Sequence, residues 1–261
     1  APYRRYLQWL ARQDRDSPIL FWARYLDGYE ETASVPSERN LGARQNYVPL
    51  SMPWRLDADD TQRIKVLAAR LHVTVNTVIQ TLWAVLLTTY TERRDVVFGA
   101  TVSGRPESLP GVERMVGLFI NTLPVRVQIE ANEGFVSLVQ RVQADALAAQ
   151  EHATCPLAEI QAQSALHSHL FDHILVFENY PLDEQLQALE AQIKVESSDV
   201  FEQIHYDLGL LVADGMDHLA MRFIANGAAY PEQRLARMVT HFVELTANVL
   251  AETDRPVWQH R

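Results

Sequence analysis

The sequence predicts an α/β (α+β two-layer) fold, in which a mixed β-sheet is packed by helices. Runs with strand-like composition are interspersed with helical runs along the whole chain. One helical run, residues 75–90, is apolar nearly all round and therefore predicts a helix buried against a sheet. With 48% hydrophobic and 21% charged residues among 261, the chain can bury one dominant core.

Two short helices are predicted within residues 3–26. Apolar residues recur there at near-helical spacing, and the pattern breaks at residues 14–18. Residues 30–44 are rich in Ser, Glu, Arg and Asn and show no periodicity. We therefore expect a connecting loop there and a boundary between two lobes near residue 43.

Residues 46–56 predict a strand at the edge of the sheet, because Pro49 and Pro53 cannot donate to a sheet ladder. A helix is expected to start in the acidic stretch 57–60. Its apolar face consists of Ile64, Leu67, Ala68 and Leu71.

The later elements follow from the same patterns. Strands are expected at residues 96–102, 117–129, 171–181, 206–215 and 218–227. Helices are expected at residues 134–152, 157–163 and 231–253. The last two strands are expected to form a hairpin about Asp214 and Gly215.

Charge and cysteine content exclude several classes of function. The formal net charge is -10, with 33 acidic against 23 basic residues, which argues against a nucleic-acid partner. No run approaches the roughly 18 apolar residues of a membrane span, and the first residues lack a signal peptide's apolar centre. The single Cys155 rules out an intramolecular disulfide. We expect a cytoplasmic protein without a membrane partner.

The common catalytic signatures are missing. The sequence contains no G-x-S-x-G elbow, P-loop, dinucleotide fingerprint or H-E-x-x-H pair. His167, His169 and His173 would share a face only in a fully extended segment, so we do not expect a metal site. Cys155 is expected to be a small apolar residue, because no activating neighbour is identified for its thiol.

Three segments carry polar residues next to predicted strands. Arg105, in "SGRP", follows a buried strand and presents a guanidinium suited to carboxylate partners, with a structural salt bridge as its plain role. In "YDLGLLV" the plain role of Asp207 is to begin a strand while backbone amides cap it. Glu178 and Asn179, in "FENYP", have the plain role of forming a turn.

The whole chain resembles the later part of a condensation domain of nonribosomal peptide synthetases. The segments that carry the resemblance, in order, are "PYRRYLQWLARQD", "NTVIQTLWAVLLTTYTERRDVVFGATVSGRP", "MVGLFINTLPVRV", "LFDHILVFENYP", "YDLGLLV" and "DRPV". Their joint presence is far more specific than any single segment. In that family "DVVFGATVSGRP" and "MVGLFINTLPVRV" lie beside a tunnel between two lobes.

The resemblance implies two lobes, each similar to chloramphenicol acetyltransferase. Carrier-protein thioesters enter the tunnel from opposite faces, and an acceptor amine attacks the donor thioester to form an amide. Family catalysis centres on an H-H-x-x-x-D-G motif in the N-terminal lobe, and this sequence has no adjacent histidine pair. We therefore expect residues 1–43 to be the last helices of the N-terminal lobe with a linker, and residues 44–261 to be the C-terminal lobe. Such a piece should be inactive alone.

The resemblance also assigns site residues and partners. Arg105 matches an arginine that ion-pairs with the aspartate of the missing motif, which supports the active site structurally. The residues that match positions near the tunnel are Ser103, Asn121, Glu178, Asn179, Tyr206 and Asp207. Gly209 departs from the usual threonine or serine after "YDL" and puts a hydroxyl contact there in doubt. The resemblance implies no directly bound cofactor. Its expected partners are an upstream lobe, donor and acceptor carrier proteins with phosphopantetheine-tethered substrates, and an adjacent adenylation domain.

Three alternatives stay open on the sequence. A condensation-like module can be non-catalytic and recruit carrier proteins or tailoring enzymes. An epimerisation or cyclisation relative has the same fold, although "MVGLFINTLPVRV" and "FENYP" resemble ordinary condensation domains better. A stand-alone acyltransferase would turn over a soluble amine.

Overall fold

A single mixed sheet of six strands forms the centre of the computed structural model, which describes residues 2–38, 47–178, 206–215 and 218–260. The strands are β1 (Pro49–Arg55), β2 (Asp95–Ser103), β3 (Ile120–Gln128), β4 (His173–Glu178), β5 (Leu208–Asp214) and β6 (Leu219–Asn226). Their order is β1-β6-β5-β4-β2-β3, and β2, β4 and β5 run parallel while the outer pairs are antiparallel. The predicted α/β class is confirmed.

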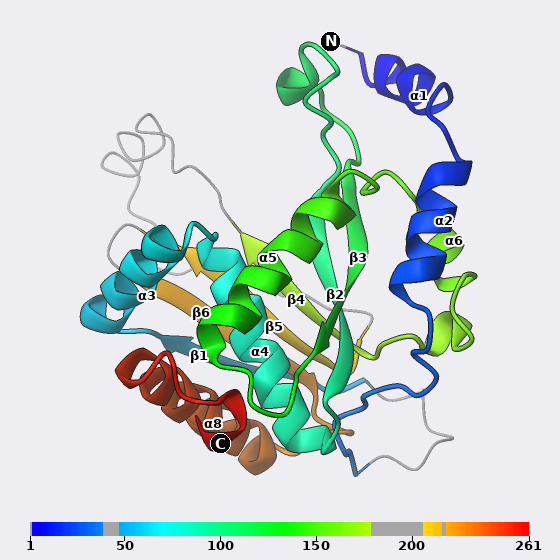
Figure 1. The fold of residues 1–261 in the computed structure, drawn as a ribbon. Coiled ribbons are helices and arrows are strands. Elements are labelled where there is room, and N and C mark those ends of the chain that lie inside the picture. The colour runs from blue at the N-terminus through cyan, green and yellow to red at the C-terminus, as the bar shows by residue number, and fades with distance from the viewer. Residues whose placement is uncertain (1, 39–46, 179–205, 216–217, 261) are drawn as a thin grey trace.

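Helices cover mainly one face of this sheet (Figure 1). The helices are α1 (Arg4–Leu10), α2 (Asp16–Tyr25), α3 (Ala58–Leu71), α4 (Val75–Thr91), α5 (Phe135–Gln150), α6 (Leu157–Gln161) and α8 (Glu232–Ala251). The Asp57 carboxylate caps α3 by accepting from the Asp60 N–H, and the Thr74 hydroxyl caps α4 by accepting from the Thr77 N–H. Both starts agree with the predicted ones.

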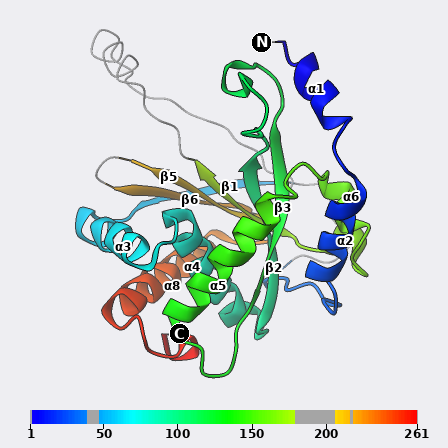
Figure 2. The ribbon, with the colours of Figure 1, turned by 45° about the horizontal axis from the view of Figure 1, so that its top comes forward.

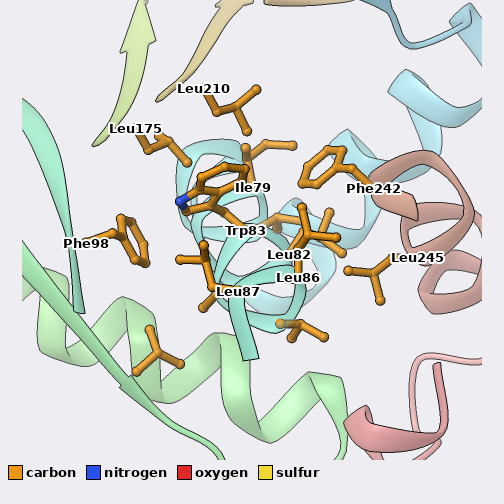
Figure 3. Close-up of a cluster of buried hydrophobic side chains, with 14 of the residues drawn as sticks. Ile79, Leu82, Trp83, Leu86, Leu87, Phe98, Leu175, Leu210, Phe242 and Leu245 are labelled. Carbon is orange, nitrogen blue, oxygen red and sulfur yellow. The ribbon is translucent and has the colours of Figure 1, made fainter. Parts of the chain in front are cut away.

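Helix α4 lies at the centre of the main core, as its all-round apolar pattern predicts. Figure 3 shows Trp83 and its neighbours on α4 between side chains of the strands and of α8. The residues drawn there include Ile79, Leu82, Leu86 and Leu87 of α4, Phe98, Leu175 and Leu210 of the sheet, and Phe242 and Leu245 of α8. Because apolar area buried at this density is the main favourable term in folding, α4 fixes the sheet to its helical layer.

Helices α1 and α2 lie along the β2–β3 side of the sheet (Figure 2). Trp22 of α2 and Leu26, the C-cap residue of that helix, are buried with Val97 and Phe171 in a second apolar cluster. The Arg126 guanidinium of β3 donates to the carbonyl oxygens of Tyr25 and Asp27, which fastens the end of α2 to the sheet. The boundary expected near residue 43 falls within residues 39–46, outside the described residues.

The two outer strands explain how the sheet avoids further pairing. Among the described residues, strand β1 pairs only with β6, and it contains both prolines, so the predicted edge strand is confirmed for this part of the chain. On the opposite edge, Pro124 of β3 lacks an N–H, and the Arg126 N–H donates to the Tyr25 hydroxyl at 2.8 Å. These contacts occupy hydrogen-bonding groups that another strand would need.

Two predicted strands begin later than expected. The strand expected from residue 117 begins at Ile120, because Gly117 and Phe119 instead contact the N-terminal helix α1. The run expected at 171–181 forms β4 only from His173, since residues 167–169 make a 3-10 turn just before it. The expected hairpin is confirmed, with Asp214 paired to Leu219 and the Gly215 N–H bonded to the His218 carbonyl.

Within the described residues, no individual helix has both the length and the apolar composition needed to cross a membrane. The consecutive helices α3 and α4 reach those values only as a pair, and they are bent by 106° relative to each other.

Candidate functional site

Ser103 and Glu178 end two neighbouring strands on the face of the sheet that lies away from α4. The parallel pairing of β2 with β4 consists of Gly99 with Ile174 and Ala100 with Leu175, and Ser103 and Glu178 each lie three residues beyond its last pair. Side chains alternate between faces, and Phe98 and Leu175 point to the helical core. Ser103 and Glu178 therefore lie on the opposite face, where Ser103 is exposed and Glu178 half-buried.

Glu178 belongs to a row of paired residues that continues across the rest of the sheet. Glu178 pairs with Ala213, Ala213 pairs with Ala220, and Ala220 pairs with Arg55 on the edge strand. All of these side chains are half-buried or exposed. The row thus places the small side chains of Ala213 and Ala220 between a carboxylate and a guanidinium at one end of the sheet.

Arg105 organises the loop that joins β2 to β3 just beyond Ser103. Its Nη1 donates to the carbonyl oxygens of Val112 and Met115, and its guanidinium lies 4.1 Å from the centre of the Phe119 ring. Among the described residues, its Nε and Nη2 have no hydrogen-bond partner. In the described part of the chain, Arg105 therefore contacts backbone carbonyl oxygens in place of the expected salt bridge. The edge of its guanidinium formed by Nε and Nη2 makes none of these contacts.

Helix α1 packs on this loop through aromatic rings. Phe119 contacts Tyr3 edge-on with ring centres 5.1 Å apart, and Tyr6 with ring centres 4.6 Å apart. The Tyr3 ring covers Gly117, where a side chain would overlap it, and its hydroxyl donates to the Leu118 carbonyl. We call Tyr3, Tyr6, Arg105 and Phe119 the Phe119 cluster. It brings together "PYRRYLQWL", "SGRP" and "MVGLF", which are far apart in the sequence.

Apolar side chains are exposed beside the Phe119 cluster. Val116, Leu118 and Ile120 are 92%, 75% and 66% exposed, whereas Met115, just before them, and Phe119, between the last two, are buried. We call these three exposed residues the 116–120 strip. Contiguous exposed apolar side chains of this kind mark a surface that meets a partner.

Asn121 is held in a structural position on the other side of β3. Its Nδ2 donates to the carbonyl oxygens of Ala153 and Cys155 at 2.9 and 2.7 Å, and its Oδ1 accepts from the Thr122 N–H. Both amide hydrogens are thus used to hold the turn after α5. Its assignment to a substrate tunnel stays a prediction.

Tyr206 and Asp207 lie at the opposite end of the sheet from Ser103 and Glu178. They precede Leu208, which pairs with His173 at the start of β4. The Tyr206 ring packs at 5.5 Å from Phe171, and burial raises the pKa of its hydroxyl. The structure therefore does not bring these two residues together with Ser103, and Asn179 lies outside the described residues.

Asn226 is a polar residue that the sequence patterns did not single out. It is fully buried, its Nδ2 donates to the Asp207 carboxylate at 2.9 Å, and its Oδ1 accepts from the N–H groups of Val48 and Ala228. It thus joins the start of β1, the start of β5 and the end of β6. The one signal was Asn226-Gly227, a turn-forming pair after a strand.

The remaining nucleophile and ligand candidates are separated or buried. His167 and His169 belong to a 3-10 turn, whereas His173 is fully buried in β4. Within the described ranges, no three His, Cys, Asp or Glu side chains group to hold a metal ion. Burial, helped by Glu159, raises the pKa of the Cys155 thiol to about 11, so this cysteine is protonated at neutral pH.

The described cavities lie along α2, away from Ser103 and Arg105. One of about 730 Å³ is lined by residues that include Asp14, Phe21 and His152, and one of about 330 Å³ adjoins it through Arg24 and Tyr25. Neither cavity is lined by any of the described site residues expected from the sequence.

Comparison with protein families and relatives identifies the kind of domain to which this surface belongs. A family model described as "Condensation domain" matches residues 1–260. Tyrocidine synthase 2 of Brevibacillus parabrevis is 39% identical over 248 residues, which cover 94% of this chain and 7% of that protein. The chain thus spans less than a tenth of the length of this relative.

Solved structures share the fold at lower identity. A four-domain nonribosomal peptide synthetase, solved in its holo form with AMP and glycine, superimposes with a TM-score of 0.83 at 18% identity, over 95% of this chain and 20% of that one. The X-domain from teicoplanin biosynthesis in its complex with OxyB superimposes with a TM-score of 0.80 at 22% identity, over 99% and 58% of the two chains. Both support the fold expected from the sequence.

Proposed function

Because this chain belongs to the condensation-domain family, we propose that it forms one lobe of a domain that joins two carrier-protein-bound thioesters through an amide bond. The observation that carries this proposal is the surface around Arg105. One edge of its guanidinium has no partner among the described residues, and the apolar 116–120 strip is exposed beside it. A second lobe with a carboxylate and an apolar face would satisfy both.

The reaction needs alignment more than strong acid or base chemistry. The amine nitrogen of the acceptor attacks the donor's thioester carbonyl, the C–N bond forms, the C–S bond breaks, and the amine's proton ends on the departing thiol. A surface that holds two tethered substrates together and excludes water supplies much of the needed rate. We assign Ser103, Glu178 and the small residues of the Glu178 row, Ala213 and Ala220, to that surface. We assign Arg105 a positioning role.

The histidine motif of the family is supplied, in this proposal, by sequence upstream of Ala1 in a longer parent protein. The 261 residues contain no adjacent histidine pair. The aspartate of that motif takes the free edge of Arg105, and the isolated chain then forms no amide. Carrier proteins with phosphopantetheine-tethered substrates and an adjacent adenylation domain are the proposed partners, in the cytoplasm.

The test restores the upstream lobe. The parent domain is supplied with donor and acceptor aminoacyl carrier proteins, and product is measured by mass spectrometry. We expect amide formation by the complete domain, none by residues 1–261 alone, and at least a tenfold loss for Arg105→Ala. Arg70→Ala is the matched control, because Arg70 is an exposed arginine on α3. A folded complete domain without activity refutes the proposal.

A recruitment module is the second candidate, because an X-domain of the same fold has been solved in a complex with OxyB. The same assay separates the two functions. A recruiting module binds a partner enzyme and forms no amide. Its binding of that partner does not depend on Arg105. The 22% identity to that X-domain supports a shared fold alone, so amide formation is the function that we rank first.

A further inference from the structure

A group of cationic and hydrogen-bond-donating side chains occupies the outer face of α8, far along the chain from the candidate site. Arg234, Arg237 and His241 recur at spacings of three and four residues, so they share one face of the helix. Tyr90, near the end of α4, meets them from the neighbouring helix. We call these four residues the α8 cluster; α8 lies on the outside of the helical layer in Figure 1.

A direct contact joins two of the four side chains, Tyr90 and His241. The Tyr90 hydroxyl and His241 Nδ1 lie 2.9 Å apart, with ring centres at 5.8 Å. Burial raises the pKa of the Tyr90 hydroxyl, while the positive charges of Arg237 and Arg234 oppose that rise. When Tyr90 donates to Nδ1, the Nε2 nitrogen of His241 carries a hydrogen and becomes a further donor.

Neither arginine of the cluster is neutralised locally. No acidic residue lies three or four positions from Arg234 or Arg237. Apart from the two arginines themselves, the residues at those positions are Tyr230, Pro231, Gln233, Met238, Thr240 and His241. Among the described residues, neither guanidinium makes an ion pair. Like charges at this spacing destabilise a helix slightly, and Glu244 appears only beyond His241. The cluster is thus locally positive on a chain of net charge -10.

We infer that the α8 cluster docks an acidic helix of a partner protein. Two carboxylates one helical turn apart match the spacing of Arg234 and Arg237, and guanidinium groups bind carboxylates through paired hydrogen bonds. Neither described cavity is lined by a residue of the cluster. The overall negative charge disfavours nucleic acid. This docking face does not depend on amide formation.

The probe is an alanine-based helical peptide of about 18 residues, long enough to hold a helix, with glutamates at positions i, i+3 and i+7. Its control is the same peptide with glutamines. Titration into the ¹⁵N-labelled 261-residue protein is expected to shift amide signals of α8 and the imidazole signals of His241. We expect the glutamine peptide to produce neither shift.

The variant Arg234→Glu/Arg237→Glu is expected to weaken binding at least about tenfold, because two attractive pairs become repulsive. Arg12→Glu/Arg70→Glu changes the net charge equally at two exposed sites elsewhere and should leave binding unchanged. Arg234→Gln/Arg237→Gln provides a milder variant if the reversal impairs folding. The inference is overturned if the peptide does not bind, if both double reversals weaken it alike, or if inorganic phosphate binds the cluster as tightly as the peptide.

Discussion

Replacing Asn226 tests whether one buried amide fixes the segment that contains Tyr206 and Asp207. Asn226 is fully buried and joins three strand ends through three side-chain hydrogen bonds. Asn226→Ala removes all three. Asn226→Asp keeps the acceptor oxygen for Val48 and Ala228 but replaces the donor to Asp207 with a second carboxylate.

The expected cost follows from these contacts. Each of the two bonds to backbone amides contributes roughly 1 kcal/mol, and the bond to the charged Asp207 contributes about 1.5 to 3 kcal/mol. Because Val48 is half exposed, water replaces part of its bond in the variant. We therefore expect Asn226→Ala to lower the free energy of unfolding by about 3 kcal/mol. Asn226→Asp should cost a similar amount at neutral pH and less as the pH falls, because two adjacent carboxylates share a proton.

Urea unfolding followed by circular dichroism measures these differences on the 261-residue protein. Asp207→Asn is the matched control, since it keeps an acceptor for Asn226 and should cost less. The exchanged pair Asp207→Asn/Asn226→Asp restores one donor and one acceptor and should recover much of the loss. A cost below about 1 kcal/mol for Asn226→Ala, or no recovery in the exchanged pair, refutes the reasoning.

Two further predictions concern His173 and Gly117. Burial lowers the pKa of His173, so the unfolded chain binds a proton that the folded chain excludes. The free energy of unfolding should therefore fall below about pH 6.5, by up to ~1.4 kcal/mol per pH unit. His173→Leu should flatten that slope in unfolding experiments at several pH values, and an unchanged slope counts against the assignment. Gly117→Ala should displace the Tyr3 ring and speed tryptic cleavage after Arg12. Gly227→Ala is the control, because the added carbon there meets no atom closer than 3.4 Å, and it should not speed cleavage. Equal cleavage rates in the two variants would contradict the packing of α1.

Much of the fold could be predicted because its elements have strong local patterns. The all-round apolar residues of α4 and the prolines of β1 each depend on a short stretch of sequence. The start of β3 was misplaced because Phe119 packs against α1, more than a hundred residues earlier in the chain. Long-range packing of that kind overrides local strand propensity.

The site could be predicted only in part, because strand order and register set it. Nothing local places Ser103 and Glu178 at the ends of neighbouring strands, since that depends on the parallel pairing of β2 with β4. The same alternation turns Asn121 toward the turn after α5, although it is only one residue from the exposed Ile120. Asp207 and Asn226 meet only because β5 and β6 are paired.

The most direct test of the central claim is assembly of the active domain from two separately produced pieces. The upstream lobe of the parent protein and residues 1–261 are mixed with donor and acceptor aminoacyl carriers, and amide product is followed by mass spectrometry. We predict product only in the mixture, together with slower backbone amide hydrogen exchange at the 116–120 strip. Product from residues 1–261 alone, or none from two folded pieces that bind each other, would contradict the account.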